Sequence, residues 1–584
     1  MLRDLRPLFL YMRRYRWGYV WGTLSCIATN AAAVQFPRVL GWAVDKLQKN
    51  QADHRMILLF AGLLVAISVV KGGFLYAQRW ILIGISREIE FDIRNDLFRH
   101  LEKQDSGFYQ RYRTGDVMAR MTNDLNAVRM LLGPALMYSA NTVFFTVFAL
   151  FFLLHLSPWL TLVALAPMPL ASIVVQYLGH KIHDRFERIQ ASFSEISSQA
   201  QENFSGARLI RAFAREESQI GLFETLNRQY IARALRLAQL MGMLWPTLEF
   251  ILGVSMVITL LAGGHLVVEH RISVGDFVEF NTYMILLIWP IIAVGWVINL
   301  FQRGTASVQR IDELLKAVPA IDDSAADKTV GPDTVLRGEI EFKHLSFSYG
   351  ETPVLRDISL KVPAGSSLAI VGPTGSGKTT LVNLLSRLYE APAGSLLIDG
   401  RPVREYPLAV LRKNIGMVPQ ETFLFSCTIR ENLTFGVAEE NAEEMFKAAE
   451  AAHIRAEFED FPAGFETMVG ERGVTLSGGQ KQRAAIARAL LRRPAILILD
   501  DALASVDTYT EERILGGLDS YTAASTTILI SHRVSTVRNA DQIAVLNRGR
   551  IVELGRHEEL LAMDGYYAGL FQKQQLEEEL TVAG

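Results

Sequence analysis

Apolar residues are concentrated in the first half of the chain, where they form long runs separated by charged segments. A run of about 20 mostly apolar residues is long enough to cross the hydrocarbon of a bilayer as a helix. The runs of this length lie at 17–44, 56–85, 131–156, 158–180, 243–268 and 277–300. The pattern therefore predicts an all-α membrane domain with six spanning helices, which we place at residues 1–318.

Long segments rich in lysine and arginine follow the second and the fourth run, and the other connections are short. Because positively charged loops stay on the cytoplasmic side, we expect both long segments and, with six spans, both termini in the cytoplasm. Apolar residues recur in them at three- and four-residue spacing, which predicts helices that continue out of the bilayer. Each segment turns back at a break, near 104–116 and near 203–213, where a cytoplasmic domain can push.

A few polar residues fall inside the predicted spans. Glu249 lies well within the fifth span, where an ionised carboxylate is expensive unless it faces a cavity or a partner. It is therefore either a wall residue of a translocation cavity that favours cationic or polar ligands, or a protonated or hydrogen-bonded structural residue. Asn141 is expected to join helices by hydrogen bonding. Lys71, Arg79 and Trp80, in the long second span, are expected near membrane depth.

The second half of the chain has a different pattern. Residues 319–338 are polar and rich in small residues, which is typical of a linker. Short apolar strands then alternate with helical segments over 339–575, which predicts an α/β domain, and 576–584 form a C-terminal tail. The chain has 59 Lys and Arg against 61 Asp and Glu, so no global basic field favours a nucleic-acid partner.

The strongest chemical motif is "LAIVGPTGSGKTTLVNLL", a strand, a glycine-rich turn and a helix. Its spacing is that of a P-loop, whose backbone N–H groups and helix N-terminus hold phosphate. Lys378 is expected to neutralise the β- and γ-phosphates, and the Thr379 hydroxyl to bind Mg²⁺. The predicted nucleotide-binding residues of this motif are Gly372, Thr374, Gly375, Ser376, Gly377, Lys378, Thr379 and Thr380.

A second glycine-rich helix start, "LSGGQ", lies at 476–480, about twenty residues before the apolar strand and paired carboxylates of "ILILDD". This order resembles the ATP-binding cassette family, whose signature sequence is LSGGQ. The resemblance covers essentially the whole chain, and the best match is a half-transporter of the multidrug and lipid exporter type. It implies a type I/IV exporter fold, with an all-α domain of six membrane helices followed by an α/β P-loop nucleotide-binding domain.

The resemblance also implies roles for single residues. Tyr349 matches the aromatic residue that stacks on adenine, and His532 matches the switch histidine. Gln420 and Asp500 are expected to hold Mg²⁺ together with Thr379. The signature residues are expected to complete the ATP site of a second chain. Further matching positions are Ser477, Gly478, Gly479 and Gln480 of the signature, Asp507 of the D-loop, and the segment "VGERG" at 469–473.

Asp501 departs from the family pattern, because Glu usually follows the Walker B aspartate and polarises the attacking water. Because Asp is one methylene shorter than Glu, its carboxylate lies roughly 1.5 Å short of the position that a Glu carboxylate would reach. A misplacement of about 1 Å at a reacting centre can lower the rate on the order of a hundredfold. Since the signature is intact, the pattern favours a heterodimer in which this chain's own site binds MgATP and hydrolyses it poorly. It resembles the degenerate subunits of bacterial heterodimeric exporters. The alternative is a homodimer that tolerates Asp.

The resulting hypothesis is ATP-driven export of hydrophobic or amphipathic small molecules, drugs or lipids, across the bacterial inner membrane. Its cofactors are ATP and Mg²⁺, and its partners are a second half-transporter, the substrate and membrane lipids. A homodimeric lipid flippase with two Asp-containing ATP sites stays open, as does a gated channel on the same scaffold. Six spans disfavour a soluble cassette ATPase of the DNA-repair or translation type.

Overall fold

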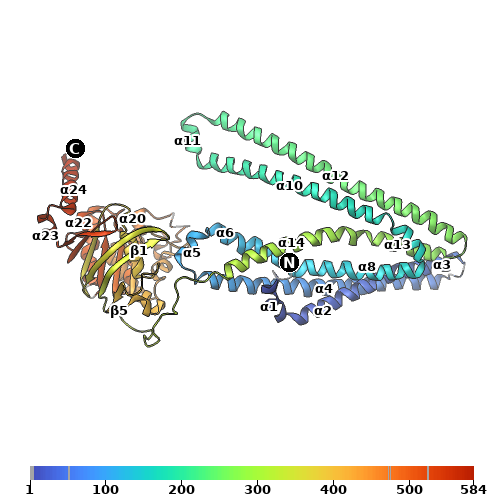
Figure 1. Ribbon diagram of the computed structural model, residues 1–584, viewed down its shortest axis with the longest axis horizontal. Helices are drawn as coiled ribbons and strands as arrows, with labels where there is room; N and C mark the ends of the chain where they lie inside the picture. The colour runs from blue at the N-terminus through green and yellow to red at the C-terminus, as the bar shows by residue number, and fades with distance from the viewer. Residues whose placement is uncertain are drawn as a thin grey trace. The chain divides into compact units, whose positions relative to one another are not determined.

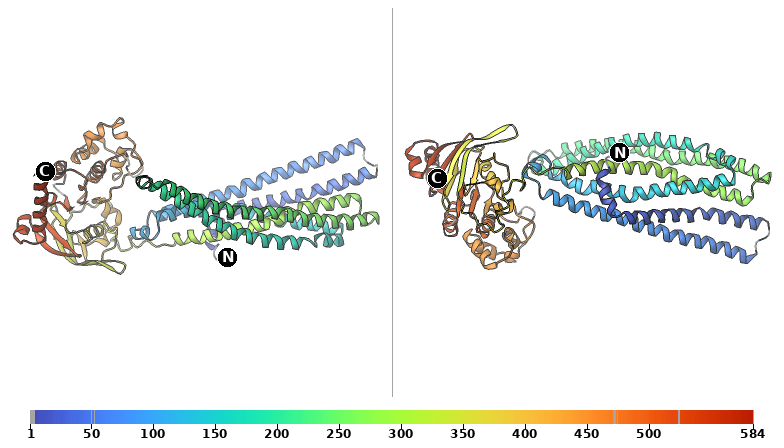
Figure 2. Two further views of the ribbon diagram at one scale, coloured as in Figure 1. Left: turned by 90° about the horizontal axis from the view of Figure 1, so that it is seen from above. Right: turned by 60° about the horizontal axis from the view of Figure 1, so that its bottom comes forward.

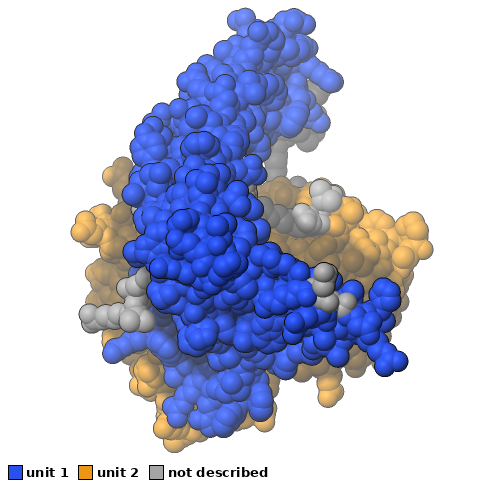
Figure 3. Space-filling model, turned by 90° about the vertical axis from the view of Figure 1, so that its right-hand side faces the viewer, with its two compact units in different colours: residues 1–102, 114–317 blue, residues 103–113, 318–584 orange. Residues whose placement is uncertain are grey.

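The computed structural model describes residues 5–49, 51, 53–470, 473, 475–522 and 525–583. The chain divides into two compact units, coloured separately in Figure 3. The first comprises residues 1–102 and 114–317, and the second comprises 103–113 and 318–584. The first unit is helical, whereas the second combines helices with two β-sheets. The predicted architecture, a helical membrane domain followed by an α/β domain, is confirmed.

The first unit is built from long helices with short interruptions (Figure 1). They are α1 (Arg6–Arg14), α2 (Arg16–Ala33), α3 (Gln35–Gln48), α4 (His54–Leu101), α6 (Thr114–Ala119), π-helix η1 (Arg120–Asp124), α7 (Leu125–Met130), π-helix η2 (Leu131–Ala135), α8 (Leu136–Leu156), α9 (Pro158–Leu165), α10 (Met168–Ser205), α11 (Ala207–Ala212), α12 (Glu216–Val268), α13 (Val274–Leu286) and α14 (Ile288–Leu315).

Five stretches of the described part of the chain are long and apolar enough to cross a membrane. They are His54–Leu101, Thr114–Leu156, Pro158–Ser205, Glu216–Val268 and Val274–Leu315. The run predicted at 17–44 instead forms two helices, α2 and α3, which meet at Val34. The cause lies in the sequence: Pro37 has no N–H to donate to the carbonyl of Ala33, so the helical hydrogen bonding is interrupted there.

Long antiparallel pairs organise this unit. Helices α10 and α12 lie side by side and are joined by the short α11 (Figure 1). The α2–α3 run lies along α4 in both views of Figure 2. Helices α3 and α13 approach so closely that a Cβ on Gly41 would lie 2.7 Å from the carbonyl oxygen of Gly275. Small residues of this kind allow close helix packing in a bilayer.

The second unit contains one short helix from the membrane half, α5 (Ser106–Arg111), and the whole α/β domain. The strands are β1 (Ile340–Tyr349), β2 (Thr352–Val362), β3 (Ser367–Val371), β4 (Leu396–Ile398), β5 (Arg401–Pro402), β6 (Ile415–Val418), β7 (Ile496–Asp500), β8 (Thr526–Ile530), β9 (Gln542–Asn547) and β10 (Arg550–Gly555). The helices are α15 (Lys378–Leu385), η3 (Val403–Glu405), α16 (Leu408–Lys413), α17 (Ile429–Thr434), α18 (Ala442–Ala451), α19 (Arg455–Glu459), η4 (Gly464–Glu466), α20 (Gly478–Leu491), α21 (Thr508–Thr522), α22 (Val534–Val537), α23 (His557–Ala562) and α24 (Tyr566–Ala583).

Two sheets form the framework of this unit. Strands β2-β1-β4-β5 make an antiparallel sheet, and β10-β9-β3-β8-β7-β6 make a second sheet. In the second sheet β9, β3, β8, β7 and β6 are parallel, and only β10 is antiparallel. The inner strands are apolar on both faces, as expected when helices or a second sheet cover them. The carboxyl ends of the parallel strands therefore meet at one edge, where the loops that follow them can build a site.

Candidate nucleotide site

A pocket of about 240 Å³ lies at this edge of the six-stranded sheet. Four strands position its residues: the P-loop follows β3, Gln420 follows β6, Asp500 ends β7, and His532 follows β8. The pocket is lined by Val354, Thr374, Gly375, Gly377, Lys378, Thr379, Thr380, Gln420, Asp500, Asp501, Ile530 and His532. The parallel topology thus brings together residues that are more than 150 positions apart.

The P-loop keeps its lysine close to its own backbone. The Lys378 Nζ donates to the carbonyl oxygens of Gly372 and Pro373, at 2.9 and 3.0 Å. Gly377 has a φ of 105° just before α15, and a Cβ on Gly372 would lie 2.0 Å from the carbonyl of Leu546, so neither position accepts another residue without strain. Burial lowers the pKa of Lys378, with Asp500 acting in the opposite direction. An arriving phosphate would offer this ammonium group a stronger acceptor.

Asp500 is the buried acid of the pocket, with 1% of its surface exposed. Burial raises its pKa, and the hydrogen bond with the Thr379 side chain only partly opposes that shift. Its Oδ2 atom has no hydrogen-bond donor. A buried carboxylate oxygen without a donor, beside a threonine hydroxyl, is the oxygen set that suits a hard divalent cation such as Mg²⁺.

Asp501 is held by its backbone in a left-handed conformation, with a φ of 51°. Its N–H donates to the carbonyl oxygen of Ile530 at 2.9 Å, which ties the residue to the end of β8. The side chain is half-buried and lines the pocket. The sheet therefore fixes the backbone of Asp501, so the backbone cannot move toward the pocket to compensate for the shorter side chain.

Tyr349, predicted to stack on adenine, stands at the end of β1 with 36% of its surface exposed. Its ring contacts Tyr389 edge to face at 5.0 Å, and its hydroxyl lies 3.3 Å from the Thr380 hydroxyl. The Tyr389 hydroxyl accepts from Gln110 of α5 at 2.7 Å. Asp105 caps α5 and also accepts from the N–H of Ala320 at 2.8 Å. The first predicted turn of the membrane helices is thus linked, through Tyr389, to the residue predicted to stack on adenine.

The signature begins α20 as a complete capping box. The Ser477 hydroxyl accepts from the N–H of Gln480 at 3.3 Å, and the Gln480 side chain accepts from the N–H of Ser477 at 2.9 Å. A Cβ on Gly479 would lie 3.0 Å from the carbonyl oxygen of Ser505. None of the signature residues lines the pocket that contains Lys378.

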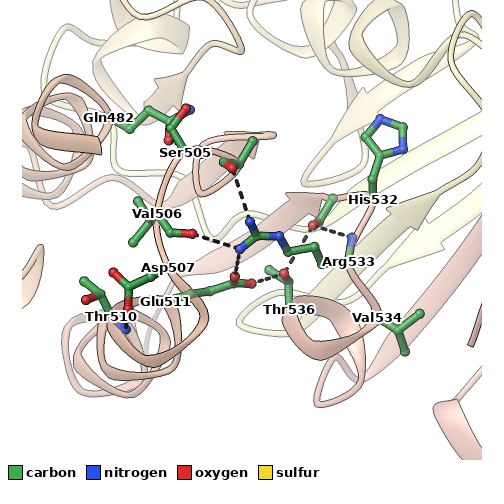
Figure 4. Close-up of polar contacts among 12 residues, drawn as sticks. Gln482, Ser505, Val506, Asp507, Thr510, Glu511, His532, Arg533, Val534 and Thr536 are labelled. Atoms are coloured by element: carbon green, nitrogen blue, oxygen red, sulfur yellow. Dashed lines mark hydrogen bonds and ion pairs between the residues drawn. The ribbon is translucent and has the colours of Figure 1, made fainter. Parts of the chain in front are cut away.

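One arginine joins the D-loop to the switch segment, as Figure 4 shows. The Arg533 guanidinium donates to the carbonyl of Val506 at 2.9 Å and to the carboxylate of Glu511 at 2.6 Å. Glu511 is 2% exposed and also binds the Thr536 hydroxyl. Asp507 caps α21 by accepting from the N–H of Thr510 at 2.9 Å, a bond that lowers its pKa. The geometry of the two loops is therefore coupled.

A glutamine of the last helix fixes the switch segment from the other side. Gln574 of α24 donates to the carbonyl of His532 at 2.6 Å and accepts from the N–H of Val534 at 2.8 Å. Sequence reasoning missed Gln574, Arg533 and Glu511. Their pairing depends on segments distant in sequence, so no local motif could have revealed them.

The remaining predicted residues are placed as follows. Gly372 forms the P-loop backbone, and Ser376 is buried with a hydroxyl that has no partner. Asn141, predicted to join helices, accepts from Asn30 at 2.8 Å. Glu249 is exposed on α12. Within "VGERG", Glu471 and Arg472 lie outside the described residues.

A P-loop pocket and helices of membrane-crossing length in one chain define a membrane-bound ATPase. Two family models match: "ABC transporter transmembrane region" over residues 20–291 and "ABC transporter" over residues 355–504. The chain belongs to the ABC transporter family. It is an exporter half-transporter, a multi-pass membrane protein that binds and hydrolyses ATP.

Similar proteins span nearly the whole chain. A "Probable multidrug resistance ABC transporter ATP-binding/permease protein YheI" of Bacillus subtilis is 35% identical over 99% of this chain and 98% of its own length. An "ATP-dependent lipid A-core flippase" of Syntrophus aciditrophicus is 37% identical over 88% of this chain and 86% of its own. The solved "Structure of a bacterial Atm1-family ABC exporter with ATP bound" has a TM-score of 0.78 and 27% identity, and covers 96% of this chain and 99% of the other.

Proposed function

We propose that the chain is one subunit of a heterodimeric exporter, in the bacterial inner membrane, for hydrophobic or amphipathic molecules of the drug or lipid class. The names of its relatives, a multidrug transporter and a lipid A-core flippase, support this substrate range. In this topology the long charged segments and both termini face the cytoplasm. ATP bound at the P-loop would meet Lys378, with Mg²⁺ held by Thr379, Asp500 and Gln420.

The observation that carries the asymmetric assembly is the contrast between Asp501 and the rest of the pocket. Lys378, the buried Asp500 and His532 all line one pocket, so this chain brings together the groups that we expect to meet the phosphates and Mg²⁺. The water-polarising position alone carries a shortened carboxylate. Ser477, Gly478 and Gly479 remain outside this pocket, where they can complete the site of a second chain.

The test is to purify the chain alone and together with a half-transporter that carries Glu after its Walker B aspartate. Both samples are reconstituted in proteoliposomes, and ATPase activity and uptake of a fluorescent amphiphile are measured. We expect the assembled pair to exceed the chain alone by at least about tenfold in turnover, or about 1.4 kcal/mol in barrier. A homodimer of this chain that transports at the rate of the pair would establish the alternative, a symmetric flippase or exporter.

Glu249 remains a candidate for the substrate cavity. An exposed carboxylate inside a predicted span needs a cavity or a partner subunit to face, and both fit a dimeric exporter. Glu249→Gln should shift the preference between cationic and neutral substrates while basal ATP turnover is kept. Loss of assembly without a change in preference would assign the residue a structural role.

A further inference from the structure

The switch segment is held in place by the last helix of the chain. Gln574 of α24 bridges the two peptide groups on either side of Arg533. Its Nε2 atom donates to the carbonyl oxygen of His532 at 2.6 Å, and its Oε1 atom accepts from the N–H of Val534 at 2.8 Å. Because one partner is an acceptor and the other a donor, the bridge requires an uncharged amide.

Helix α22 depends on this contact at its first turn. The first N–H groups of a helix have no acceptor within the helix, and the N-cap residue of α22, Arg533, makes no capping hydrogen bond with its side chain. The Gln574 side chain therefore takes the place of a cap. Val534, whose N–H is bonded in this way, is only 3% exposed, and a buried N–H without an acceptor is costly.

The start of α24 is anchored in the core of the α/β domain. Tyr567 is fully buried, and its hydroxyl lies 2.7 Å from the Nδ1 atom of His557. Tyr567 and Phe571 pack into one apolar cluster with Val534 of α22. Gln574 follows Tyr567 by seven residues, about two helical turns, and so lies on the same face of α24. The helix therefore presents Gln574 to the switch segment from a fixed support.

His532 stands between the groups that we expect to meet phosphate and metal. Strand β8 lies between β3 and β7, so His532, which follows β8, has the P-loop on one side and Asp500 on the other. Burial raises the pKa of Asp500, and His532 is close enough to oppose that shift. The imidazole lines the pocket with Lys378 and points away from the Arg533 guanidinium (Figure 4). An imidazole N–H in this place can donate to a terminal phosphate oxygen.

We propose that Gln574 is a positioning residue through which α24 sets the affinity of this site for ATP relative to ADP. With the amide bridge in place, the backbone of His532 is fixed and its imidazole is held toward the phosphate that ADP lacks. Without the bridge, part of the binding energy is spent on ordering the segment, and the preference for the terminal phosphate falls. The inference rests on the nucleotide pocket of the proposed function and is independent of the asymmetric assembly.

The test measures nucleotide binding to the assembled complex, on ice and with Mg²⁺ present. The complex is photolabelled with an azido-ATP, the two chains are separated, and unlabelled ATP and ADP serve as competitors for the labelling of this chain. We expect Gln574→Leu to weaken ATP binding by about tenfold and ADP binding by less than about twofold, because only ATP has the phosphate that His532 reaches. Gln575→Ala, a change at the exposed neighbouring glutamine of α24, should alter neither affinity.

Two further variants separate positioning from packing. Gln574→Glu keeps the length of the side chain and its acceptor but has no N–H for the carbonyl of His532, so it should lower ATP affinity as Gln574→Leu does. It also carries the measurement if Gln574→Leu fails to assemble. Gln574→Leu combined with His532→Ala should bind ATP no more weakly than His532→Ala alone, because Gln574 acts through His532. Thermal unfolding of each complex checks that the fold is kept.

Equal losses of ATP and ADP affinity, or losses from Gln574→Leu and His532→Ala that add in the double variant, would overturn the proposal and leave Gln574 a purely structural role. Unchanged affinities in both Gln574 variants would also overturn it. Lys378→Ala distinguishes this failure from that of the proposed function. If labelling depends on Lys378 and not on Gln574, only this inference is wrong. If labelling does not depend on Lys378, the nucleotide pocket is wrongly assigned and both are wrong.

Discussion

The two glycine-rich helix starts of the α/β domain look alike in sequence and behave differently in the structure. The P-loop before α15 closes around its own lysine and lines a pocket with Asp500 and His532. The signature before α20 satisfies its own cap through Ser477 and Gln480 and contributes nothing to that pocket. Both present backbone N–H groups suited to phosphate. The difference supports the proposal that the P-loop forms one half of an ATP site and that the signature acts on a second chain.

The largest effect should follow from Gly479→Asp. Its Cβ would lie 3.0 Å from the Ser505 carbonyl oxygen, and its carboxylate would face the phosphates of ATP bound to the second chain. We expect ATPase activity of the assembled complex to fall by about a hundredfold or more, the scale of losing oriented charge-stabilising groups. ATP affinity at the pocket of Lys378 should be unchanged.

The control for this variant is Gly516→Asp, because a Cβ there meets open space. It should keep normal turnover. If Gly479→Asp also kept normal turnover, the signature would not act on a second chain, and the comparison of the two helix starts would lose its meaning.

Lys378→Ala tests the other helix start. The phosphates lose their main cationic partner, so we expect ATP affinity at this site to fall by about ten- to a hundredfold. Lys361→Ala, which removes an exposed lysine paired with Glu339, serves as the control. Photolabelling with an azido-ATP, followed by separation of the two chains, reads the two sites independently. Unchanged labelling of this chain would refute the P-loop assignment.

Asp500→Asn should change stability with a defined pH dependence. Because burial raises the pKa of Asp500, its ionised form destabilises the nucleotide-free fold at neutral pH. At pH 8 the free energy of unfolding of the variant should therefore be about 1 kcal/mol higher than that of the wild type. This difference in stability should become smaller as the pH falls through the raised pKa of Asp500, because the wild-type carboxyl then takes up a proton. MgATP should stabilise the variant less than the wild type.

Asp541→Asn is a control whose expected change in stability is opposite to that of Asp500→Asn. Hydrogen bonds from Ser367 lower the pKa of Asp541, so its ionised form stabilises the fold above its ordinary carboxyl pKa. That variant should unfold earlier at pH 8, and its loss should disappear as pH falls through the lowered pKa. Thermal unfolding of the intact complex without nucleotide measures both. A destabilised Asp500→Asn at pH 8 would show that the partners of the carboxylate, Thr379 among them, outweigh the effect of burial.

Local patterns were enough to predict most of the residues that line the candidate nucleotide pocket. The strand, turn and helix around Lys378 identified the P-loop, and the order of motifs led to Gln420, Asp500 and His532, which the structure brings into one pocket. The missed groups depend on long-range packing: Gln574 reaches the switch segment from the last helix.

The membrane half was less predictable. Hydropathy identified the five long runs but did not reveal that Pro37 divides the first predicted span. It also pointed to Glu249 because it is a charge inside an apolar run. The membrane unit also contains a cavity lined by Gln78, whose buried Oε1 atom has no hydrogen-bond donor among the described residues. This cavity could not be predicted, because it depends on how several helices pack together.

The most direct measurement compares steady-state ATPase of the purified complex at saturating MgATP with single variants in each chain. Asp501→Asn should lower turnover by less than about tenfold, or about 1.4 kcal/mol in barrier, because that site already contributes little. Replacing the second chain's corresponding Glu by Gln should abolish most of the activity, and ATP should stay bound behind Lys378 and Asp500. If Asp501→Asn instead stopped ATPase as completely as the change in the second chain, this site would be an ordinary catalytic one, and the asymmetric mechanism would be wrong.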